Sequence, residues 1–328
     1  MPIAASSYDV VAVGNALVDV LAQVPDSFLA EHGMEKGTMS LVDAAVALRL
    51  QNALNNTVQT SGGSAANTMS GIASLGGAAL FIGKVSNDDL GAEFKREIES
   101  IGVQFVRGAP VAGIPTGGCV IAVTPDAQRT LNTFLGVSSL LTPEDIDPVA
   151  VAAGKVVYLE GYLYDEPAAK AGFREAANIA HGANRKVSLT LSDAFCVQRH
   201  RDDFHALIAE EVDILFGNEA ELEALYETSD FNEAVAQLRA HCEFAVITRS
   251  EKGSVVVTHG EVLEVPAAKV AEVVDTTGAG DLFAAGFLYG FTRDMDLARC
   301  AEIGAIAAAE VISHMGPRPL VPLSSLIK

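Results

Sequence analysis

The 328-residue chain has few basic residues for its length. Lys and Arg total 22 against 42 Asp and Glu, which gives a formal charge of -20 at pH 7. A surface of this sign repels phosphodiester backbones and anionic lipid headgroups, so we expect neither nucleic acid nor a membrane as a partner. An anionic ligand would need a local positive trap.

The chain is also poor in cysteine and lacks several motifs that would define a function class. Its four cysteines, Cys119, Cys196, Cys242 and Cys300, form no CxxC pair, which favours reduced thiols over a disulfide framework or a zinc site. The sequence begins without a basic segment ahead of an apolar run, and it has no apolar stretch of about 20 residues. We therefore expect a cytoplasmic protein.

Two nucleotide-binding signatures are absent as well. The sequence contains no GxxxxGK[ST] string and no GxGxxG after its first predicted strand. These absences argue against a P-loop ATPase and against a dinucleotide-dependent dehydrogenase.

The composition is that of a folded protein, with 49% hydrophobic and 20% charged residues. Short β-branched runs alternate with amphipathic stretches, a pattern that predicts a mostly parallel sheet with helices on both faces. In such a sheet ligands bind at the carboxyl ends of the strands. The expected strands span residues 8–14, 79–83, 155–160, 186–191, 212–216 and 244–248, and the expected helices span 87–101, 166–181, 231–241, 281–291 and 296–313.

Two intervals, residues 17–60 and 103–135, interrupt this alternation. Strand-like runs follow one another in the second interval without long helices between them. No Pro-, Gly- or Ser-rich linker divides the chain. We therefore expect a single α/β domain over residues 1–328, with a small β-rich lid formed by the two intervals.

The sharpest local signal is DTTGAGD, at Asp275–Asp281, which opens directly into an apolar helix. The first N–H groups of a helix have no intrahelical partner, and Gly278, Ala279 and Gly280 carry little side chain to block an approaching anion. Asp281 would stand beside this anion hole, where a base can take a proton from a hydroxyl group that attacks a phosphorus atom. The alternative is that Asp281 only complements the helix dipole and that the glycines only form a turn.

Gly286 and Gly290, inside the same predicted helix, each cost about 1 kcal/mol relative to alanine. Something must therefore approach that face closely. A neighbouring alanine-rich helix around residues 305–312 is the simpler explanation, and a bound nucleotide is the other.

Three further segments offer polar groups at the predicted binding edge. In SGGSAAN, Gly62 and Gly63 could form a hinge and Asn67 could bind sugar hydroxyls; the alternative is a helix start capped by Ser64. Asn15, Asp19 and Glu160 follow predicted strands, and a carboxylate there can accept hydrogen bonds from a vicinal diol. Either carboxylate could instead be a solvated turn residue.

Asn218 and Glu221 stand three residues apart at a strand-to-helix junction. One interpretation is a capping box. The other is a hydrated Mg²⁺ and phosphate site. The string alone does not decide between them.

Taken together, these motifs resemble the ribokinase-like, or PfkB, family of carbohydrate and nucleoside kinases. Gly62, Gly63 and Asn67 look like its amino-terminal substrate motif, and DTTGAGD looks like its catalytic motif. The resemblance implies a ribokinase-like α/β fold, Asp281 as catalytic base and an anion hole at Gly278–Gly280. It further implies roles for other residues: substrate binding by Asn15, Asp19, Gly62, Gly63, Asn67, Glu160 and Arg129, nucleotide binding by Asn218, Glu221, Thr248, Gly253 and Thr277, Mg²⁺ held through water by Glu221, and a monovalent cation at Asp275, Thr277 and Gly316.

Within that family, the strings GNALVD and PTGGC and the segment around Arg129 look like adenosine kinases. The resemblance thus implies an ATP-dependent kinase that acts on the primary hydroxyl of a nucleoside, with ATP, Mg²⁺ and K⁺ as candidate cofactors. Phe134 and Tyr162 are candidates to contact a purine. Ser250 replaces the middle glycine of the family's nucleotide turn. A sugar kinase and a non-catalytic binding protein are the alternatives. We expect the protein to be a monomer or a homodimer.

Overall fold

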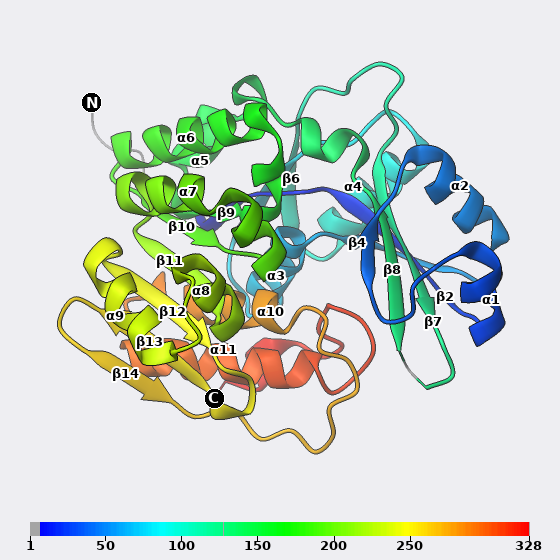
Figure 1. The fold of residues 1–328 in the computed structure, drawn as a ribbon. Coiled ribbons are helices and arrows are strands. Elements are labelled where there is room, and N and C mark those ends of the chain that lie inside the picture. Colours follow the sequence, from blue (N-terminus) through cyan, green and yellow to red (C-terminus); the bar gives the residue numbers. More distant parts are fainter. Residues whose placement is uncertain (1–6, 127, 328) are drawn as a thin grey trace.

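The computed structural model describes residues 7–126 and 128–327, whose strands form two sheets. The larger has nine strands in the order β14-β13-β12-β11-β10-β9-β1-β5-β6 (Figure 1). Strands β6 to β12 of this order pair in parallel, and β13 and β14 close one edge in antiparallel pairing. The mostly parallel sheet is thus confirmed. Its strands are β1 (Tyr8–Val13), β5 (Ala79–Gly83), β6 (Val103–Arg107), β9 (Gly154–Glu160), β10 (Lys186–Thr190), β11 (Ile214–Asn218), β12 (Phe244–Thr248), β13 (Ser254–Thr258) and β14 (Val262–Val265).

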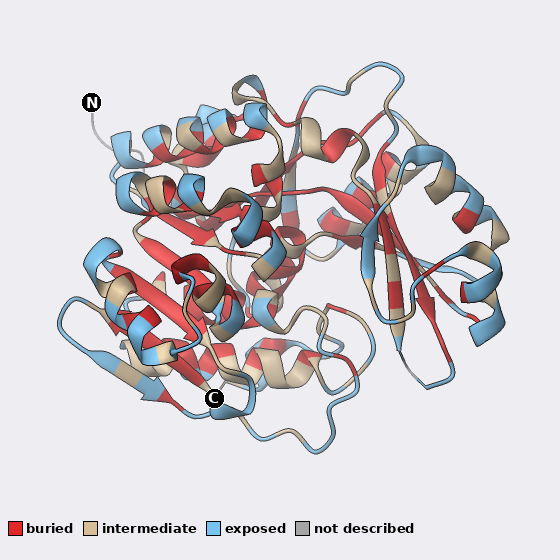
Figure 2. Cartoon of the chain, in the orientation of Figure 1, coloured by how far each residue is buried: buried red, intermediate tan, exposed pale blue. Residues whose placement is uncertain are grey.

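Helices cover both faces of this sheet, because its central strands are apolar on both sides. In β1, Val10 and Ala12 belong to one hydrophobic cluster and Val11 and Val13 to the other, and all four are fully buried. Figure 2 shows the central strands of this sheet mostly in the colour of buried residues. The first cluster includes residues of α3 (Ser64–Ser74), α4 (Asp89–Ser100), α10 (Ala279–Phe291) and α11 (Leu297–Val311). The second includes residues of α5 (Pro148–Ala152), α6 (Pro167–Gly182), α7 (Ala194–Glu211), α8 (Glu219–Tyr226) and α9 (Phe231–His241).

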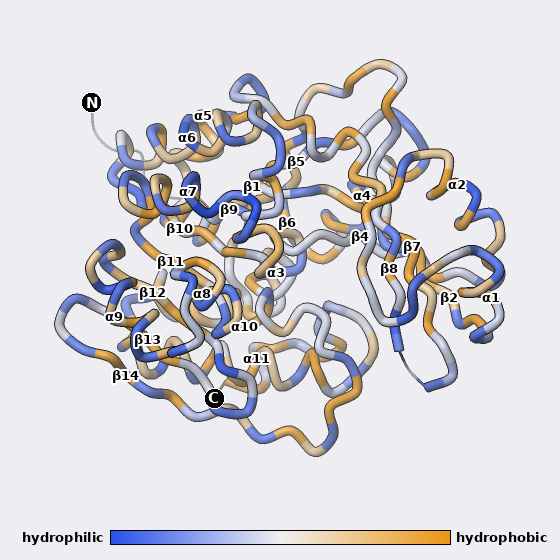
Figure 3. The backbone as a smooth tube through the Cα atoms, in the orientation of Figure 1, coloured by the Kyte–Doolittle hydropathy of each residue, from blue (hydrophilic) through white to orange (hydrophobic). Residues whose placement is uncertain are grey.

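The helices expected from amphipathic spacing are all present, with ends shifted by at most two residues. Hydrophilic and hydrophobic residues alternate along most of them, as expected for helices with one solvated face (Figure 3). Within residues 7–126 and 128–327, no helix combines the length and the apolar character that crossing a membrane requires.

The smaller sheet has five strands in the order β3-β8-β7-β2-β4, at the right of Figure 1. Its side chains alternate between two faces. Val18, Val20 and Ala22 join the hydrophobic cluster that includes Leu29 of α1 and Leu50 of α2. Leu17 and Asp19 therefore point to the opposite face. The elements of this unit are β2 (Leu17–Gln23), α1 (Asp26–His32), β3 (Met39–Leu41), α2 (Ala44–Ala53), β4 (Val58–Gly62), β7 (Gly117–Val123) and β8 (Arg129–Phe134).

One part of the expected lid interval belongs elsewhere. Residues 103–107, expected in the small β-rich unit, form β6 and pair in parallel with β5 at the edge of the larger sheet. The reason is α4, which connects β5 to β6 and packs on both sheets through the buried side chains of Phe94 and Ile98. The remaining strands from the two intervals do form the smaller sheet.

Helices α10 and α11 pack against each other at unusually close range. A Cβ atom added to Gly286 would lie 2.6 Å from the backbone of Gly304, and one added to Gly290 would lie 2.9 Å from the sulfur of Cys300. The simpler explanation for these helical glycines, a neighbouring helix, is therefore confirmed.

This close packing generates a stability prediction for Gly286→Ala. The added methyl group overpacks the contact with Gly304, so we expect a loss of about 1–3 kcal/mol in the free energy of unfolding, measured by urea denaturation. Gly182→Ala is the control, because Gly182 also lies in a helix, at the end of α6, but no atom lies within 4 Å of a Cβ atom added there. The control should be neutral or slightly stabilised; equal behaviour of the two variants would contradict the packing argument.

Candidate functional site

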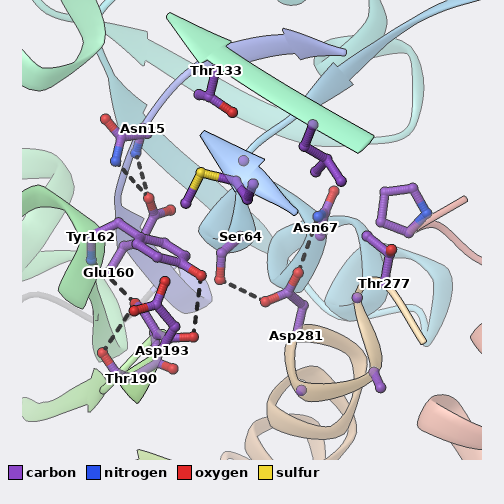
Figure 4. Close-up of a pocket in the computed structure, with 18 of the residues that line it drawn as sticks. Asn15, Ser64, Asn67, Thr133, Glu160, Tyr162, Thr190, Asp193, Thr277 and Asp281 are labelled. Atoms are coloured by element: carbon purple, nitrogen blue, oxygen red, sulfur yellow. Dashed lines mark hydrogen bonds between the residues drawn. The ribbon is translucent and has the colours of Figure 1, made fainter. Parts of the chain in front are cut away.

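A cavity of about 580 Å³ lies between the smaller sheet and the carboxyl ends of the strands of the larger sheet. One wall is the inward face of the smaller sheet, which contributes Leu17, Asp19, Met39, Leu41, Cys119, Ile121, Leu131 and Thr133. The opposite wall comes from residues at the strand ends, including Glu160, Asn218 and Thr248, and from the start of α10. The cavity thus brings together groups that lie far apart in the sequence (Figure 4).

The start of α10 presents main-chain N–H groups to this cavity. Gly278 is the N-cap residue and has a φ of +80°, a left-handed conformation that favours glycine. The Ala279 N–H bonds back to the Thr276 carbonyl and the Leu282 N–H to the Gly278 carbonyl. The N–H groups of Gly280 and Asp281 are left without a backbone acceptor among the described residues. This end of the helix can therefore accept an anion.

The Asp281 carboxylate lies at the same helix start and is held by α3. Ser64 Oγ donates a hydrogen bond to Asp281 Oδ1 at 2.6 Å, and Asn67 Nδ2 donates one to Asp281 Oδ2 at 3.0 Å (Figure 4). Burial raises the pKa of Asp281, against the opposing effects of these two hydrogen bonds and of the Arg318 charge. Such a carboxylate is fixed in direction and can act as a proton acceptor.

Gly62 and Gly63 connect the smaller sheet to α3 and allow two close approaches. Gly63 has a φ of +99°, and a Cβ atom there would lie 2.2 Å from the Asn15 carbonyl oxygen. A Cβ atom on Gly62 would lie 2.4 Å from Asp19 Oδ1. Glycine at both positions thus lets α3 begin directly under the cavity.

Asp19 is the inward-facing carboxylate of the smaller sheet. It lines the cavity, and its side chain makes no hydrogen bond with the described residues. Burial raises the pKa of Asp19 to about 7, although Arg318 and Arg129 act in the opposite direction. Its oxygens are free to accept hydrogen bonds from ligand hydroxyl groups.

Glu160 is engaged differently. Its Oε1 accepts hydrogen bonds from the main-chain N–H and the side-chain Nδ2 of Asn15, at 3.2 and 2.8 Å, and its Oε2 accepts one from the Ala65 N–H at 2.8 Å. Only 1% of Glu160 is exposed, and burial raises its pKa to about 7. The carboxylate therefore fixes Asn15 and the start of α3 at the cavity wall.

Asn218 and Glu221 form the capping box that was one of the two interpretations. Glu221 Oε2 accepts a hydrogen bond from the Asn218 N–H, and Asn218 Oδ1 accepts one from the Glu221 N–H. Both residues also line the cavity. Burial, together with the charges of Asp193 and Asp281, raises the pKa of Glu221 to about 7.

No group of three or more His, Cys, Asp or Glu side chains within residues 7–126 and 128–327 is arranged to ligate a metal ion directly. A divalent cation in this cavity would therefore bind largely through water or through ligand phosphate oxygens, as Mg²⁺ commonly does. The position of Glu221 is compatible with that mode.

The expected monovalent-cation site is filled by protein groups. Asp275 Oδ2 lies 2.8 Å from Arg129 Nη1 and accepts a hydrogen bond from the Gly316 N–H at 2.9 Å, and Oδ1 accepts one from the Thr277 N–H at 3.0 Å. Arg129 also donates to Thr277 Oγ1. The ion pair is largely buried, with 8% and 5% of the two side chains exposed. These residues do not fit K⁺ in this arrangement, because the guanidinium supplies the positive charge.

The expected nucleotide turn is only partly at the cavity. Thr248 lines the cavity, whereas Gly253, in the turn between β12 and β13, is not among the lining residues. A Cβ atom on Gly253 would lie 2.1 Å from the Val265 carbonyl oxygen. Ser250 has a φ of +53°. The position thus requires the left-handed conformation that glycine adopts most readily, which gives a physical reason for glycine there in the family.

Several residues of the site were not assigned from the sequence, among them Ser64, Arg318 and Phe195. Ser64 was considered only as a helix cap, although it donates to Asp281. Arg318 lies beside Asn67, and nothing in the string GPRP distinguishes it. Phe195 lines the cavity although 74% of it is exposed.

The two aromatic candidates for a purine contact differ in their placement. Tyr162 lines the cavity, whereas Phe134 is not among the lining residues. A stacking pair made of these two rings is therefore not present.

Comparisons with known proteins agree with this geometry. Residues 39–323 match the family model described as pfkB family carbohydrate kinase. The solved structure of adenosine kinase from Sinorhizobium meliloti is 48% identical, with a TM-score of 0.90 over 98% of both chains. A probable sugar kinase protein from Rhizobium etli CFN 42 is 44% identical, also with a TM-score of 0.90 over 98% of both chains. Adenosine kinase from Saccharomyces cerevisiae is 28% identical over 94% of this chain and 95% of its own length.

The raised pKa values in the cavity generate a prediction about stability and pH. Asp19, Glu160 and Glu221 have pKa values of about 7 when folded, and ordinary carboxyl pKa values near 4 when unfolded. Between about pH 4 and pH 7, the folded state therefore binds more protons than the unfolded state. The free energy of unfolding should therefore fall as the pH rises from about 4 to about 7, and then level off.

Urea denaturation from pH 5 to pH 8 measures this dependence. Asp19→Asn should reduce its slope by up to about 1.4 kcal/mol per pH unit, because one titrating group is removed. Asp89→Asn, at an exposed position on α4, is the control and should leave the slope unchanged. An Asp19→Asn slope equal to that of the unmodified protein would show that Asp19 does not titrate in this range.

Proposed function

We propose that this chain, which belongs to the pfkB family of carbohydrate kinases, transfers the γ-phosphoryl group of ATP to the primary hydroxyl of an adenosine-like nucleoside. The family makes it a phosphotransferase that acts on a hydroxyl group. The observation that carries the proposal is the Asp281 carboxylate, oriented at the anion-accepting start of α10 and facing the same cavity as Asp19.

In this proposal Asp281 is the catalytic base. It takes the proton of the substrate hydroxyl as that oxygen forms a bond to the γ-phosphorus, while the bond from this phosphorus to the bridging oxygen breaks and ADP leaves. Of the anion hole expected at Gly278–Gly280, the Ala279 N–H is already bonded to Thr276, so the unpaired N–H groups of Gly280 and Asp281 would stabilise the charge on the transferred phosphoryl oxygens. The hydrogen-bond donors Ser64 and Asn67 would aim the carboxylate.

The substrate assignment is supported by the two walls of the cavity. Asp19 would accept hydrogen bonds from the two hydroxyls of a ribose, with Asn15 and Asn67 beside it. A free sugar would leave the apolar part of the lining uncovered, which is why we favour a nucleoside. The 44% identity to a probable sugar kinase keeps a sugar as the second candidate. The apolar surface, which is suited to a flat base, comes from Leu17, Ile121, Leu131, Leu135 and Tyr162.

Glu221 would hold Mg²⁺ through water, and the ion would supply positive charge to the phosphates when bound. Asn218 and Thr248 would lie beside the nucleotide, since they line the same end of the cavity. We do not include K⁺, because Arg129 already pairs with Asp275. The cytoplasmic location remains a prediction, in keeping with four buried free thiols.

The smaller sheet would act as a lid that closes on the substrate, with Gly62 and Gly63 as the hinge. Closure would exclude water, so that the substrate hydroxyl and not water attacks the phosphorus. The apolar side chains of Met39 and Leu41 are half exposed at the cavity and would be covered in the closed form.

The base assignment predicts that Asp281→Asn lowers turnover by about 100-fold or more, since loss of a general base has this effect, while ATP binding changes little. A coupled assay of ADP release and calorimetry with a non-hydrolysable ATP analogue measure the two quantities. Asp202→Asn, at an exposed site on α7, should behave as the unmodified protein. Near-normal turnover of Asp281→Asn would rule out this role.

The substrate assignment is tested by ADP release with adenosine, other nucleosides, ribose, fructose and fructose phosphates. We expect the highest kcat/KM with adenosine and no requirement for K⁺, because Arg129 neutralises Asp275. A higher kcat/KM with ribose or fructose would favour the sugar kinase. Binding of these compounds without ADP formation would identify a non-catalytic binding protein.

A further inference from the structure

Arg318 is a buried cation next to the catalytic carboxylate. It follows Pro317 in the segment after α11, and 12% of its side chain is exposed. Its Nη1 lies 3.7 Å from Glu97 Oε1, but neither Nη1 nor Nη2 makes a hydrogen bond with the described residues. The carboxylates whose charges act on this guanidinium are, from the largest effect down, Glu97, Asp19 and Asp281. Its unpaired N–H groups are unfavourable in a buried position, so the site retains this cation at a cost.

Asn67 connects this guanidinium to Asp281. Arg318 Nε donates to Asn67 Oδ1 at 3.4 Å, and Asn67 Nδ2 donates to Asp281 Oδ2 at 3.0 Å. The two contacts fix the amide in one orientation, because the flipped amide would place its NH₂ group against the guanidinium and its oxygen against the carboxylate. Arg318 is not among the residues that line the cavity, whereas Asn67 is. The cation therefore reaches the site through Asn67.

The charges around Asp281 come from several elements. Glu160 on β9 and Glu221 on α8 carry the same sign as Asp281, and Tyr158 and Tyr162 would do so if ionised. The donors Ser64 and Asn67 on α3 are neutral. Of the described groups that act on Asp281, Arg318 is the cation.

We propose that Arg318 is a positioning residue for the catalytic base: it orients the Asn67 amide and keeps the Asp281 carboxylate ionised in a cavity of like charge. This inference rests on the proposed role of Asp281. The guanidinium lies behind Asn67 and does not line the cavity, but its charge also lowers the pKa of Asp19, so the shift assigned to Asp281 must appear in kcat, which reports the substrate-bound enzyme, as well as in kcat/KM.

The test is the pH dependence of kcat/KM in Arg318→Met. Without the cation the base holds its proton to higher pH, so the acidic limb of the profile should move upward by roughly one pH unit, and activity should recover above the limb. Arg318→Lys keeps the positive charge, so its acidic limb should lie close to that of the unmodified protein. Arg49→Met, at an exposed site on α2, is the matched control and should leave the limb in place.

Asn67→Ala gives a second route to the same conclusion, because it removes the connection and leaves Arg318 intact. It should move the limb in the same direction, and the double variant should show less than the sum of the two shifts. This variant and Arg318→Lys also serve if Arg318→Met fails to fold, which circular dichroism would reveal.

The outcomes separate this inference from the proposed function. An equal loss of activity at every pH, with the limb unmoved and Asp281→Asn inactive, would overturn the role of Arg318 alone. A raised KM for ATP without a limb shift would also overturn it, in favour of a phosphate contact. High turnover of Asp281→Asn would overturn both.

Discussion

The site depends on holding a carboxylate and an anion-accepting helix start at the same point in an acidic protein. Side chains cannot supply much positive charge, because acidic residues outnumber basic ones almost two to one. Main-chain N–H groups at the start of α10 take that role, and Asp281 stands in the same helical turn. Two donors from α3 then prevent the carboxylate from turning toward those N–H groups. Three other cavity carboxylates, Asp19, Glu160 and Glu221, are tolerated because burial raises their pKa values and lets them hold protons near neutral pH.

Each sheet contributes one half of this arrangement. The parallel sheet is buried on both faces, so polar groups are available only at the ends of its strands, and the cavity lies there. The smaller sheet is covered by helices on one face only. Alternation along β2 sends Val18 and Val20 to those helices and Asp19 to the cavity. In the proposed function, the larger sheet would therefore provide the contacts to the phosphates, and the smaller sheet the contacts to the acceptor molecule.

The sequence predicted the elements whose signals are local. The parallel strands have the expected apolar runs, and α10 was indicated by a glycine turn ahead of an apolar helix. What failed depended on tertiary pairing: β6 has the short alternating pattern of a lid strand, and only the packing of α4 shows that it joins the larger sheet. The edge strands β13 and β14 were missed, since they lack a following helix.

The same distinction applies to the site. Glycine-rich strings and strand-end carboxylates located most of the lining residues, but partners on other elements could not be inferred from them. Glu160 lines the cavity, but nothing in the sequence indicated that its carboxylate also anchors Asn15. Asp275 was expected to bind a cation, and its cation is the side chain of Arg129, 146 positions away in the chain. Arg318 carries no motif, because its importance comes from three-dimensional charge balance alone.

The glycine contact between α10 and α11 has a mechanical consequence. With the backbone of Gly304 directly against Gly286, α10 has no room to slide or tilt toward its neighbour. The carboxylate at its first turn is thus mounted on a closely packed helix pair, so in the proposed closure a change in the width of the cavity would come from the opposite wall. Under the proposed closure of the smaller sheet, the protein would work as a one-sided clamp that carries the acceptor to the phosphates rather than the reverse.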